Sequence, residues 1–464
     1  MASIALTSRL DYLATRKFPK EFPAPGRARL RPSRGGTPRI SKNGSDGASP
    51  SPTHLTIPRS PFDIPDMPRP FPLIALALLL ALPTRAADLA VSTDFPGGAA
   101  QVTAIDQTAR LITFKIPTPK QGGWQSWWYL KVSGITPGEK VTLHLTNGVA
   151  HAGRAVYSTD GKSWKYTEIV TFEEKGKRAL YRQKIDAAEA YFAWYQPYLP
   201  ENAQQLIKDA TGKPGVETFE LCKSEEGLPV VGLRFREGDR PDDKRLGVWI
   251  HARQHAWETG GSWAADGLAR WLMSDDARAK NLRQIADFTL IPIMDVDSVA
   301  GGRGGKDQKP HDHNRDWIDE PIWAATKAAM ARVKAMDAAS RLDLFLDLHD
   351  PGWAGNIEFW CHLYPKMTDP RKHNTDLFLA AGKREITGPL AFNGKAVSKY
   401  ALTTPSSGIW ATLKTKEKVV GGTFEIGVAP PRGHDADPPS HHLTCGKQIG
   451  LAVEAYLADA TRKP

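Results

Sequence analysis

Cysteine is scarce in this chain, since its 464 residues include three, Cys222, Cys361 and Cys445. They lie far apart and form no close-spaced pair, which excludes a zinc knuckle and allows at most one disulfide. A long apolar run is also lacking, because the apolar stretch at residues 71–82 is shorter than the roughly 20 residues that span a bilayer. No internal repeat is apparent.

Acidic residues are outnumbered by basic ones, and the formal net charge is +10. Much of the excess lies in residues 1–66, where arginines crowd together without an apolar period. Such a charge run is typical of a solvated tail, so we predict no nucleic-acid binding. The apolar fraction of 41% is near the globular average, and together with the length it predicts two folded units plus tails.

Residues 67–87 have the features of a signal peptide. A basic start at Met67 is followed by a short apolar run and then by Thr-Arg-Ala, a small-residue cleavage site. Pro83 and Arg85 cut the apolar run short, which disfavours a membrane anchor. We therefore predict a secreted or periplasmic protein with no stable membrane insertion after cleavage. Residues 1–66 are then either a disordered leader or a sign that translation starts at Met67.

Short apolar strands separated by turn signals fill residues 88–205. Pro137-Gly138 and Asp160-Gly161 mark two of the turns. This pattern predicts a small all-β sandwich, followed by a linker at residues 209–215. The strands are expected at residues 111–116, 127–132, 140–145 and 190–195.

Residues 216–462 show a different pattern, in which apolar runs alternate with helical stretches. This alternation predicts an α/β domain, and in such sheets functional groups gather beyond the carboxyl ends of the strands. The expected strands lie at 247–250, 288–293 and 342–348, and the expected helices at 263–273 and 322–336.

His255 and Glu258 follow directly after the first of these strands. A His and a Glu three residues apart share one face of a helical turn, so both can reach one ion. Zinc in hydrolases takes three such ligands and keeps a fourth position for water. Taken alone, a His-x-x-Glu pair arises by chance in many chains and is more often an ordinary capping or surface pair.

His349 stands at the carboxyl end of the strand 342–348, between Asp347 and Asp350. A His in this place is suited to be the third zinc ligand, and the aspartates would then orient its imidazole. The alternative is a core His bonded to a neighbouring carboxylate.

Glu425 lies in the otherwise apolar stretch 419–426. Buried carboxylates are unfavourable unless they are paired or functional. Near a water activated by zinc, such a Glu would act as the general base and later deliver the proton to the leaving amine.

Asn314 and Arg315 follow a loop rich in glycine and charge. Arg pairs with a carboxylate through two hydrogen bonds, and an adjacent Asn amide can add another. The pair therefore suits capture of a peptide's C-terminal carboxylate, although Asn-Arg alone is also common in surface loops.

With these four elements in the order in which the chain carries them, the sequence resembles the M14 zinc carboxypeptidases from about residue 100 to its end. It is most similar to the cytosolic carboxypeptidase-like subgroup, in which a β-sandwich precedes the catalytic domain. The aromatic tract at residues 191–198, which ends in Pro-Tyr, is similar to that of the subgroup.

The resemblance implies an α/β/α sandwich around a mixed eight-stranded sheet. It also implies one Zn²⁺ per chain held by His255, Glu258 and His349, and a metallocarboxypeptidase that cleaves at the C-terminus of a peptide or protein. By position, Asn314 and Arg315 match the substrate-carboxylate pair. Glu425 matches the catalytic glutamate.

Some positions depart from the family pattern. The loop before Asn314 has a different length, so the cation that stabilises the oxyanion is assigned to Arg303, with Lys306 and Lys309 as alternatives. Ala256-Trp257 replaces Pro-Gly between the first two ligands and is expected to narrow the pocket. Ile409 replaces the basic residue of glutamate-trimming members, which argues against acidic specificity.

Two other functions are compatible with the sequence. The first is a zinc amidase or deacylase that acts on small acyl-amino acids or cell-wall peptides. The second is a non-catalytic secreted binding protein that uses Trp124, Trp127 and Trp128 of the sandwich, although we expect these aromatics to be core. Retention of all the ligand positions and of Glu425 favours an enzyme.

Overall fold

The computed structural model describes residues 87–148, 154–174, 178–352, 357–398, 401–427 and 438–464. The predicted leader, and the predicted signal peptide up to its last residue, lie outside these ranges. Among the helices described, none has the length and apolar character needed to cross a membrane. The three cysteines all lie in the described part and are free thiols.

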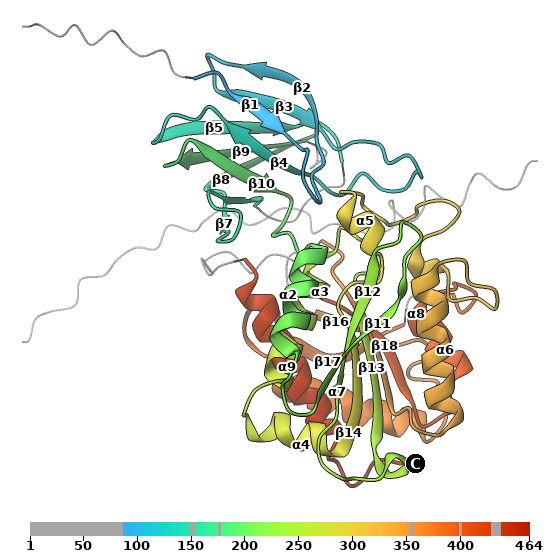
Figure 1. Ribbon diagram of the computed structural model, residues 1–464. Coiled ribbons are helices and arrows are strands. Elements are labelled where there is room, and N and C mark those ends of the chain that lie inside the picture. The colour runs from blue at the N-terminus through green and yellow to red at the C-terminus, as the bar shows by residue number, and fades with distance from the viewer. Residues whose placement is uncertain (1–86, 149–153, 175–177, 353–356, 399–400, 428–437) are drawn as a thin grey trace, which may run out of the picture. The chain divides into compact units, whose positions relative to one another are not determined.

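The first ten strands form two five-stranded sheets (Figure 1). The strand orders are β1-β4-β10-β6-β7 and β2-β3-β5-β9-β8. The four strands predicted in this region are found as β3, β4, β5 and β10. The bounds are β1 Ala90–Ser92, β2 Gln101–Asp106, β3 Leu111–Lys115, β4 Tyr129–Ser133, β5 Glu139–Leu145, β6 Val156–Ser158, β7 Lys165–Tyr166, β8 Ile169–Glu173, β9 Arg178–Ile185 and β10 Glu189–Ala193.

Alternating burial explains why these strands face each other as two layers. In β5, Val141, Leu143 and Leu145 are buried while the residues between them are partly exposed. Period-two alternation places apolar side chains on the inner face of each sheet. Trp127 and Trp128 lie in this core, which confirms their predicted role as core residues.

Helix α2 (Pro200–Ala210) connects the sandwich to the second domain. Its first residues are well suited to a helix start, because Pro is tolerated in the first turn and Glu201 complements the helix dipole. Leu206 is buried against the next domain. The predicted linker at 209–215 is therefore shorter than expected, since its first two residues belong to this helix.

The second domain is built on a mixed eight-stranded sheet of order β11-β12-β14-β13-β15-β18-β16-β17. Strands β14, β13, β15 and β18 are parallel neighbours at its centre, whereas β11, β12 and β16 add antiparallel pairs. This is the predicted fold class. The bounds are β11 Val216–Lys223, β12 Pro229–Phe235, β13 Leu246–Ala252, β14 Ala286–Ile291, β15 Leu344–His349, β16 Ile357–Trp360, β17 Phe392–Val397 and β18 Val420–Glu425.

Helices cover both faces of this sheet (Figure 1). Buried residues of α3, α4, α7 and α9 pack on one face, and those of α6 and α8 pack on the other. The bounds are α3 Thr259–Leu272, α4 Ala277–Ile285, α5 Val296–Ala300, α6 Ala324–Ala338, α7 Arg371–Glu385, α8 Ser407–Lys414 and α9 Ser440–Leu457, with short 3₁₀ turns η2 Asp242–Lys244, η3 His313–Arg315 and η4 Gly388–Leu390.

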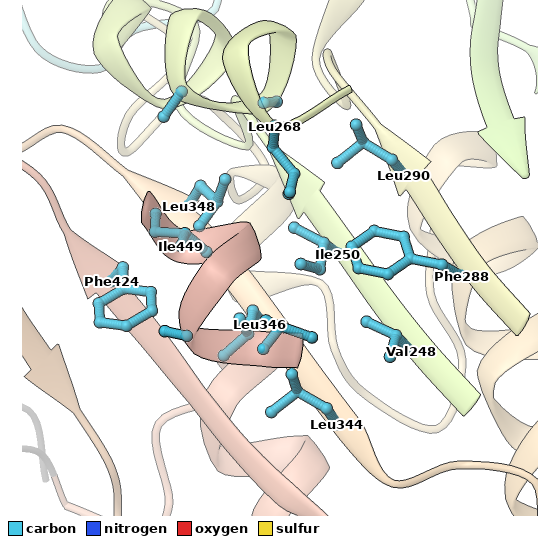
Figure 2. Packing of buried hydrophobic residues seen from close by; sticks show 14 of the residues in the cluster. Val248, Ile250, Leu268, Phe288, Leu290, Leu344, Leu346, Leu348, Phe424 and Ile449 are labelled. Carbon is cyan, nitrogen blue, oxygen red and sulfur yellow. The ribbon is translucent and has the colours of Figure 1, made fainter. Parts of the chain in front are cut away.

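The central strands have continuous apolar runs because helices cover both faces of the sheet. In β13, Ile250 belongs to the core under α3 and α9, whereas its neighbour Trp249 belongs to the core under α6 and α8. Leu346 and Leu348 of β15 pack with Ile449 of α9 (Figure 2). Each fully buried aliphatic side chain contributes about 1.5–3 kcal/mol, so the sheet is a rigid base for the residues at its strand ends.

Candidate metal and peptide site

Three neighbouring parallel strands end at the same edge of the sheet and carry the candidate residues. His255 and Glu258 follow β13, His349 is the last residue of β15, and Glu425 is the last residue of β18. The parallel register pairs His349 directly with Glu425. The sheet thus brings together residues that lie up to 170 positions apart in the sequence, counting from 255 to 425.

The two histidines face opposite oxygens of the Glu258 carboxylate. His255 Nδ1 lies 2.9 Å from Glu258 Oε1, and His349 Nδ1 lies 2.6 Å from Glu258 Oε2. All three residues are 2% exposed, and one ligand atom from each lies within 4.8 Å of the others. Two imidazole nitrogens and a carboxylate are a donor set that fits Zn²⁺ in a hydrolase.

His255 and Glu258 lie in a single turn directly before α3, in the place where the sequence predicted a turn followed by a helix. The turn is closed by a hydrogen bond from Glu258 N to His255 O, and Glu258 is the residue before the first turn of α3. A three-residue spacing brings two side chains together in such a turn as it does in a helix.

Buried carboxylates orient the far side of each imidazole. Asp347 Oδ2 lies 2.8 Å from His349 Nε2, and Asp312 Oδ1 lies 3.5 Å from His255 Nε2. Burial alone would raise the pKa of Asp347, but His349 and His251 outweigh it and hold that pKa below its usual range. An ionised carboxylate on Nε2 leaves Nδ1 free to bind a metal.

Side chains held by Asp347 extend this network. Its Oδ2 accepts hydrogen bonds from Gln254 Nε2 at 2.6 Å and from Ser407 Oγ at 2.5 Å. Gln254 in turn accepts a bond from Trp317 Nε1 through its own side-chain oxygen. These partners fix the carboxylate, and through it the ring plane of His349.

A pocket opens beside this cluster, and it contains most of the residues predicted from the sequence. Trp360, His362, Ser406 and Thr423 were not predicted, although Thr423 lies two residues before Glu425 and therefore shares its face of β18. The lining residues are His255, Lys306, Asn314, Arg315, Trp360, His362, Ser406, Thr423 and Glu425.

Glu425 is half-buried at the pocket wall. Burial raises the pKa of its carboxyl to about 7, while His349 and Lys306 act in the opposite direction. A carboxyl whose pKa lies near neutrality can both accept and return a proton near pH 7. This property suits a general base.

Asn314 and Arg315 come from the 3₁₀ turn η3. Asn314 Oδ1 accepts a hydrogen bond from Ser407 N at 3.0 Å, and its Nδ2 lies 3.1 Å from His349 Nε2. The Asn314 side chain is therefore already engaged in the network. Arg315 donates to Asn314 O at 2.8 Å and its half-buried guanidinium lines the pocket, so Arg315 is the better placed of the two to bind a carboxylate.

The structure places Arg303 away from the other predicted residues. Its Nη2 is 2.6 Å from Glu226 Oε1, and it does not line the pocket. Lys309, an alternative for the same role, is exposed. Lys306 does line the pocket, with its Nζ 3.4 Å from His255 Nδ1.

Trp257 does not narrow the pocket, contrary to expectation. Its ring is 1% exposed and packs edge-on against Trp194 of the sandwich domain, with 5.0 Å between ring centroids. The ring of Trp124, from the loop between β3 and β4, also lies near Trp257, with 6.3 Å between the ring centroids. The bulky residue between the two ligands is therefore part of the contact between the two domains.

Ile409 is also outside the pocket lining, because it is buried in α8. The structure brings Ser406, three residues earlier, to the pocket in its place. The specificity argument based on Ile409 therefore stays a prediction from family position.

These features together describe a metallohydrolase fold with its site at the carboxyl edge of the sheet. A family model described as zinc carboxypeptidase matches residues 204–337, and one described as cytosolic carboxypeptidase N-terminal domain matches residues 91–195. The chain therefore contains an M14 zinc carboxypeptidase domain, preceded by a domain of the cytosolic carboxypeptidase N-terminal type, as the sequence resemblance implied. His349 and Glu425 lie beyond the matched residues, so their roles depend on the geometry.

Curated proteins and a solved structure are similar to this chain. An uncharacterised protein of Zymomonas mobilis is 29% identical over 56% of this chain and 67% of its own length. Cytosolic carboxypeptidase 1 of Danio rerio is 26% identical over 36% of this chain, but the match spans 15% of that protein. A metallo-carboxypeptidase from Burkholderia cenocepacia has the same fold, with a TM-score of 0.69 and 20% identity over 79% of this chain and 98% of its own.

Proposed function

We propose that this protein is a zinc carboxypeptidase that removes residues from the free C-terminus of peptides. The observation that carries the proposal is the shared pocket, in which Arg315 and Glu425 stand beside the cluster of His255, Glu258 and His349. A carboxylate receptor next to a candidate metal and base is the arrangement that an exopeptidase needs.

His255, Glu258 and His349 would hold the zinc ion, one per chain. When bound, zinc supplies Lewis-acid chemistry, since it acidifies water and polarises a carbonyl oxygen. Asp347 would keep the His349 imidazole in the ligand orientation through its 2.8 Å contact with Nε2, and Asp312 lies 3.5 Å from Nε2 of His255. The donor set fits zinc because it combines two imidazoles with one carboxylate and leaves room for a further ligand.

Arg315 would bind the terminal carboxylate of the substrate and so set which bond reaches Glu425. Glu425 would take a proton from the attacking water and pass it to the nitrogen of the leaving amino acid. The bond broken is the last peptide bond, and the products are a shortened peptide and a free amino acid. Arg315 would bind the terminal carboxylate and Glu425 would transfer the proton, so variants can test the two roles separately.

The test compares peptides that carry a free C-terminal carboxylate with the same peptides as C-terminal amides. Arg315→Ala should lower kcat/KM on free-acid peptides about 30-fold or more, because a buried charged hydrogen bond is lost. It should lower kcat/KM on the amides much less, since they have no carboxylate to bind. Arg384→Ala, which removes an exposed arginine on α7, is the control and should leave both values unchanged.

Equal losses on both kinds of substrate would contradict the exopeptidase proposal. Arg315 would then support the fold or the oxyanion, and the zinc amidase alternative would explain the site better. For the binding-protein alternative, the structure offers less support, because Trp127 and Trp128 are buried in the sandwich core.

We also propose that the protein is exported after cleavage near residue 87. The support is the sequence pattern of residues 67–87, with its basic start, short apolar run and small-residue end. N-terminal sequencing of the mature protein from its native host should give a first residue close to Asp88. A mature protein that begins at Met1 or Met67 would contradict export by this signal.

A further inference from the structure

We propose that Lys306 supplies the positive charge that faces the reacting carbonyl oxygen, and that Trp124 of the sandwich domain holds it in place. This inference deepens the proposed function and rests on it. It assigns a catalytic role to Lys306 in place of Arg303, and a positioning role to a residue of the N-terminal domain.

The first observation concerns the directions in which Lys306 and Arg303 of this loop point. Lys306 lines the pocket together with Glu425, and its Nζ lies 3.4 Å from Nδ1 of His255. Arg303 instead forms an ion pair of 2.6 Å with Glu226 outside the pocket lining. The carboxylate of Glu226 offsets most of the positive charge of Arg303, so Arg303 would attract a substrate oxygen weakly. Lys306, in contrast, lies next to the proposed reacting centre.

The second observation is what contacts the Lys306 ammonium. The ring of Trp124 lies 5.1 Å from its Nζ, within the range of a cation–π interaction. The face of an aromatic ring attracts a cation but takes no proton from it and does not cancel its charge. Such a partner can fix the side chain while its N–H donors stay available to a carbonyl oxygen.

The third observation is that hydrogen bonds from the sandwich domain hold the loop that carries Lys306. Trp124 N donates to Lys306 O at 2.9 Å, and Trp124 Nε1 donates to Asp307 Oδ2 at 2.7 Å. Three residues after Lys306, Lys309 N donates to Gln121 O at 2.7 Å. The loop between β3 and β4 therefore reaches across to the active-site edge of the second domain.

Glycines on both chains permit this close approach. A Cβ on Gly123, whose φ is +99°, would lie 2.5 Å from Lys306 O, and one on Gly304 would lie 2.8 Å from Trp124 O. On the opposite side of the loop, a Cβ on Gly305 would lie 2.7 Å from Ala256 N, in the turn between the ligands His255 and Glu258. The loop is thus held between the sandwich domain and the ligand turn.

This geometry explains what each residue would do in the reaction. Negative charge develops on the carbonyl oxygen when water adds to the peptide bond, and a fixed cation beside it lowers the barrier. Lys306 would bind that oxygen directly. Trp124 does not line the pocket and acts through Lys306.

The first experiment removes or keeps the charge at position 306. Lys306→Met should lower kcat by about 10²-fold, which is the usual effect of losing one oxyanion donor, with little change in KM. Lys306→Arg should recover a large part of that loss. Lys327→Met, which removes an exposed lysine on α6, is the charge-matched control. If Arg303→Met causes the large loss and Lys306→Met does not, the inference is wrong.

A second readout does not depend on turnover. A peptide phosphonate, which mimics the tetrahedral transition state, should bind Lys306→Met much more weakly than wild type in calorimetry, whereas the free amino acid product should bind both alike. Zinc content should be equal in the two proteins. Equal affinity for the phosphonate would overturn the role of Lys306.

The third experiment is a double-mutant cycle. Trp124→Ala should lower kcat in the wild-type background, and Trp124→Phe, which keeps an aromatic face, should retain most of the activity. In the Lys306→Met background, Trp124→Ala should cause little further loss, because the group through which Trp124 acts is already absent. Independent, multiplicative losses would mean that Trp124 only supports the fold, and would overturn its positioning role.

These outcomes are distinct from failure of the proposed function. If purified wild-type protein with zinc releases no C-terminal residue from any peptide, the carboxypeptidase proposal itself is wrong. If wild type is active and the position-306 variants match it in kcat and phosphonate binding, the inference alone is wrong.

Discussion

Glu425→Gln is expected to lower kcat by about 10²-fold or more while zinc stays bound, because glutamine keeps the shape of the side chain but cannot accept a proton. The half-buried carboxyl lines the pocket with His255, and burial raises its pKa to about 7. Neither feature serves an obvious structural purpose at a strand end. Steady-state kinetics on a free-acid peptide, together with metal analysis of the same sample, would measure both quantities.

Glu417→Gln provides the matched control for this variant. Glu417 is exposed and lies just before β18, so the same chemical change there should leave kcat unchanged. If Glu425→Gln retains full activity, another group must be the base. If it loses zinc as well as activity, Glu425 contributes to the metal site, and its assignment as a base alone would be wrong.

His349→Ala is expected to abolish tight zinc binding and, with it, measurable peptidase activity. His349 supplies one of three candidate ligand atoms, and a catalytic zinc site keeps few protein ligands to spare. Its removal also leaves Asp347 without the imidazole that lies 2.8 Å away. Metal analysis should find about one zinc per wild-type chain and far less in the variant.

Thermal unfolding separates loss of metal from loss of fold. Zinc that binds the folded state should raise the Tm of the metal-free wild type, but not that of His349→Ala. His349→Gln offers a second variant that fills more of the site, should the alanine variant be unstable. His373→Ala, on α7, is the control and should bind zinc normally. Full zinc occupancy in His349→Ala would refute the ligand assignment.

The fold and the core of the site could be predicted because their signals are local. The apolar run that ends in His349 and the one that ends in Glu425 can each be recognised from a few neighbouring residues. Parallel strands then bring their carboxyl ends to one edge of a sheet without further information. The same reasoning reached His255 and Glu258, whose three-residue spacing is enough to bring them together.

The basic side chain that faces the pocket could not be predicted, because residues far away in the sequence decide which one does. Arg303 is paired with Glu226, which lies 77 positions earlier in the sequence. Lys306 contacts Trp124, which lies even further from it in the sequence. The sequence analysis assigned the role to Arg303, with Lys306 and Lys309 as alternatives, because no local feature of the loop indicates these two partners. The burial of Trp257 against Trp194 escaped prediction for the same reason.

The direct pairing of His349 with Glu425 in the sheet has a consequence for how the site would lose order. Ile426 N donates to His349 O at 2.8 Å, so ladder hydrogen bonds at the centre of the sheet link the strand that ends in His349 to the strand that ends in Glu425. Lys306 and Arg315 stand on loops and turns, which open at a lower free energy than central strands do. In hydrogen exchange, the amides near Lys306 and Arg315 should therefore lose protection first, while the strand residues leading to His349 remain protected until global unfolding.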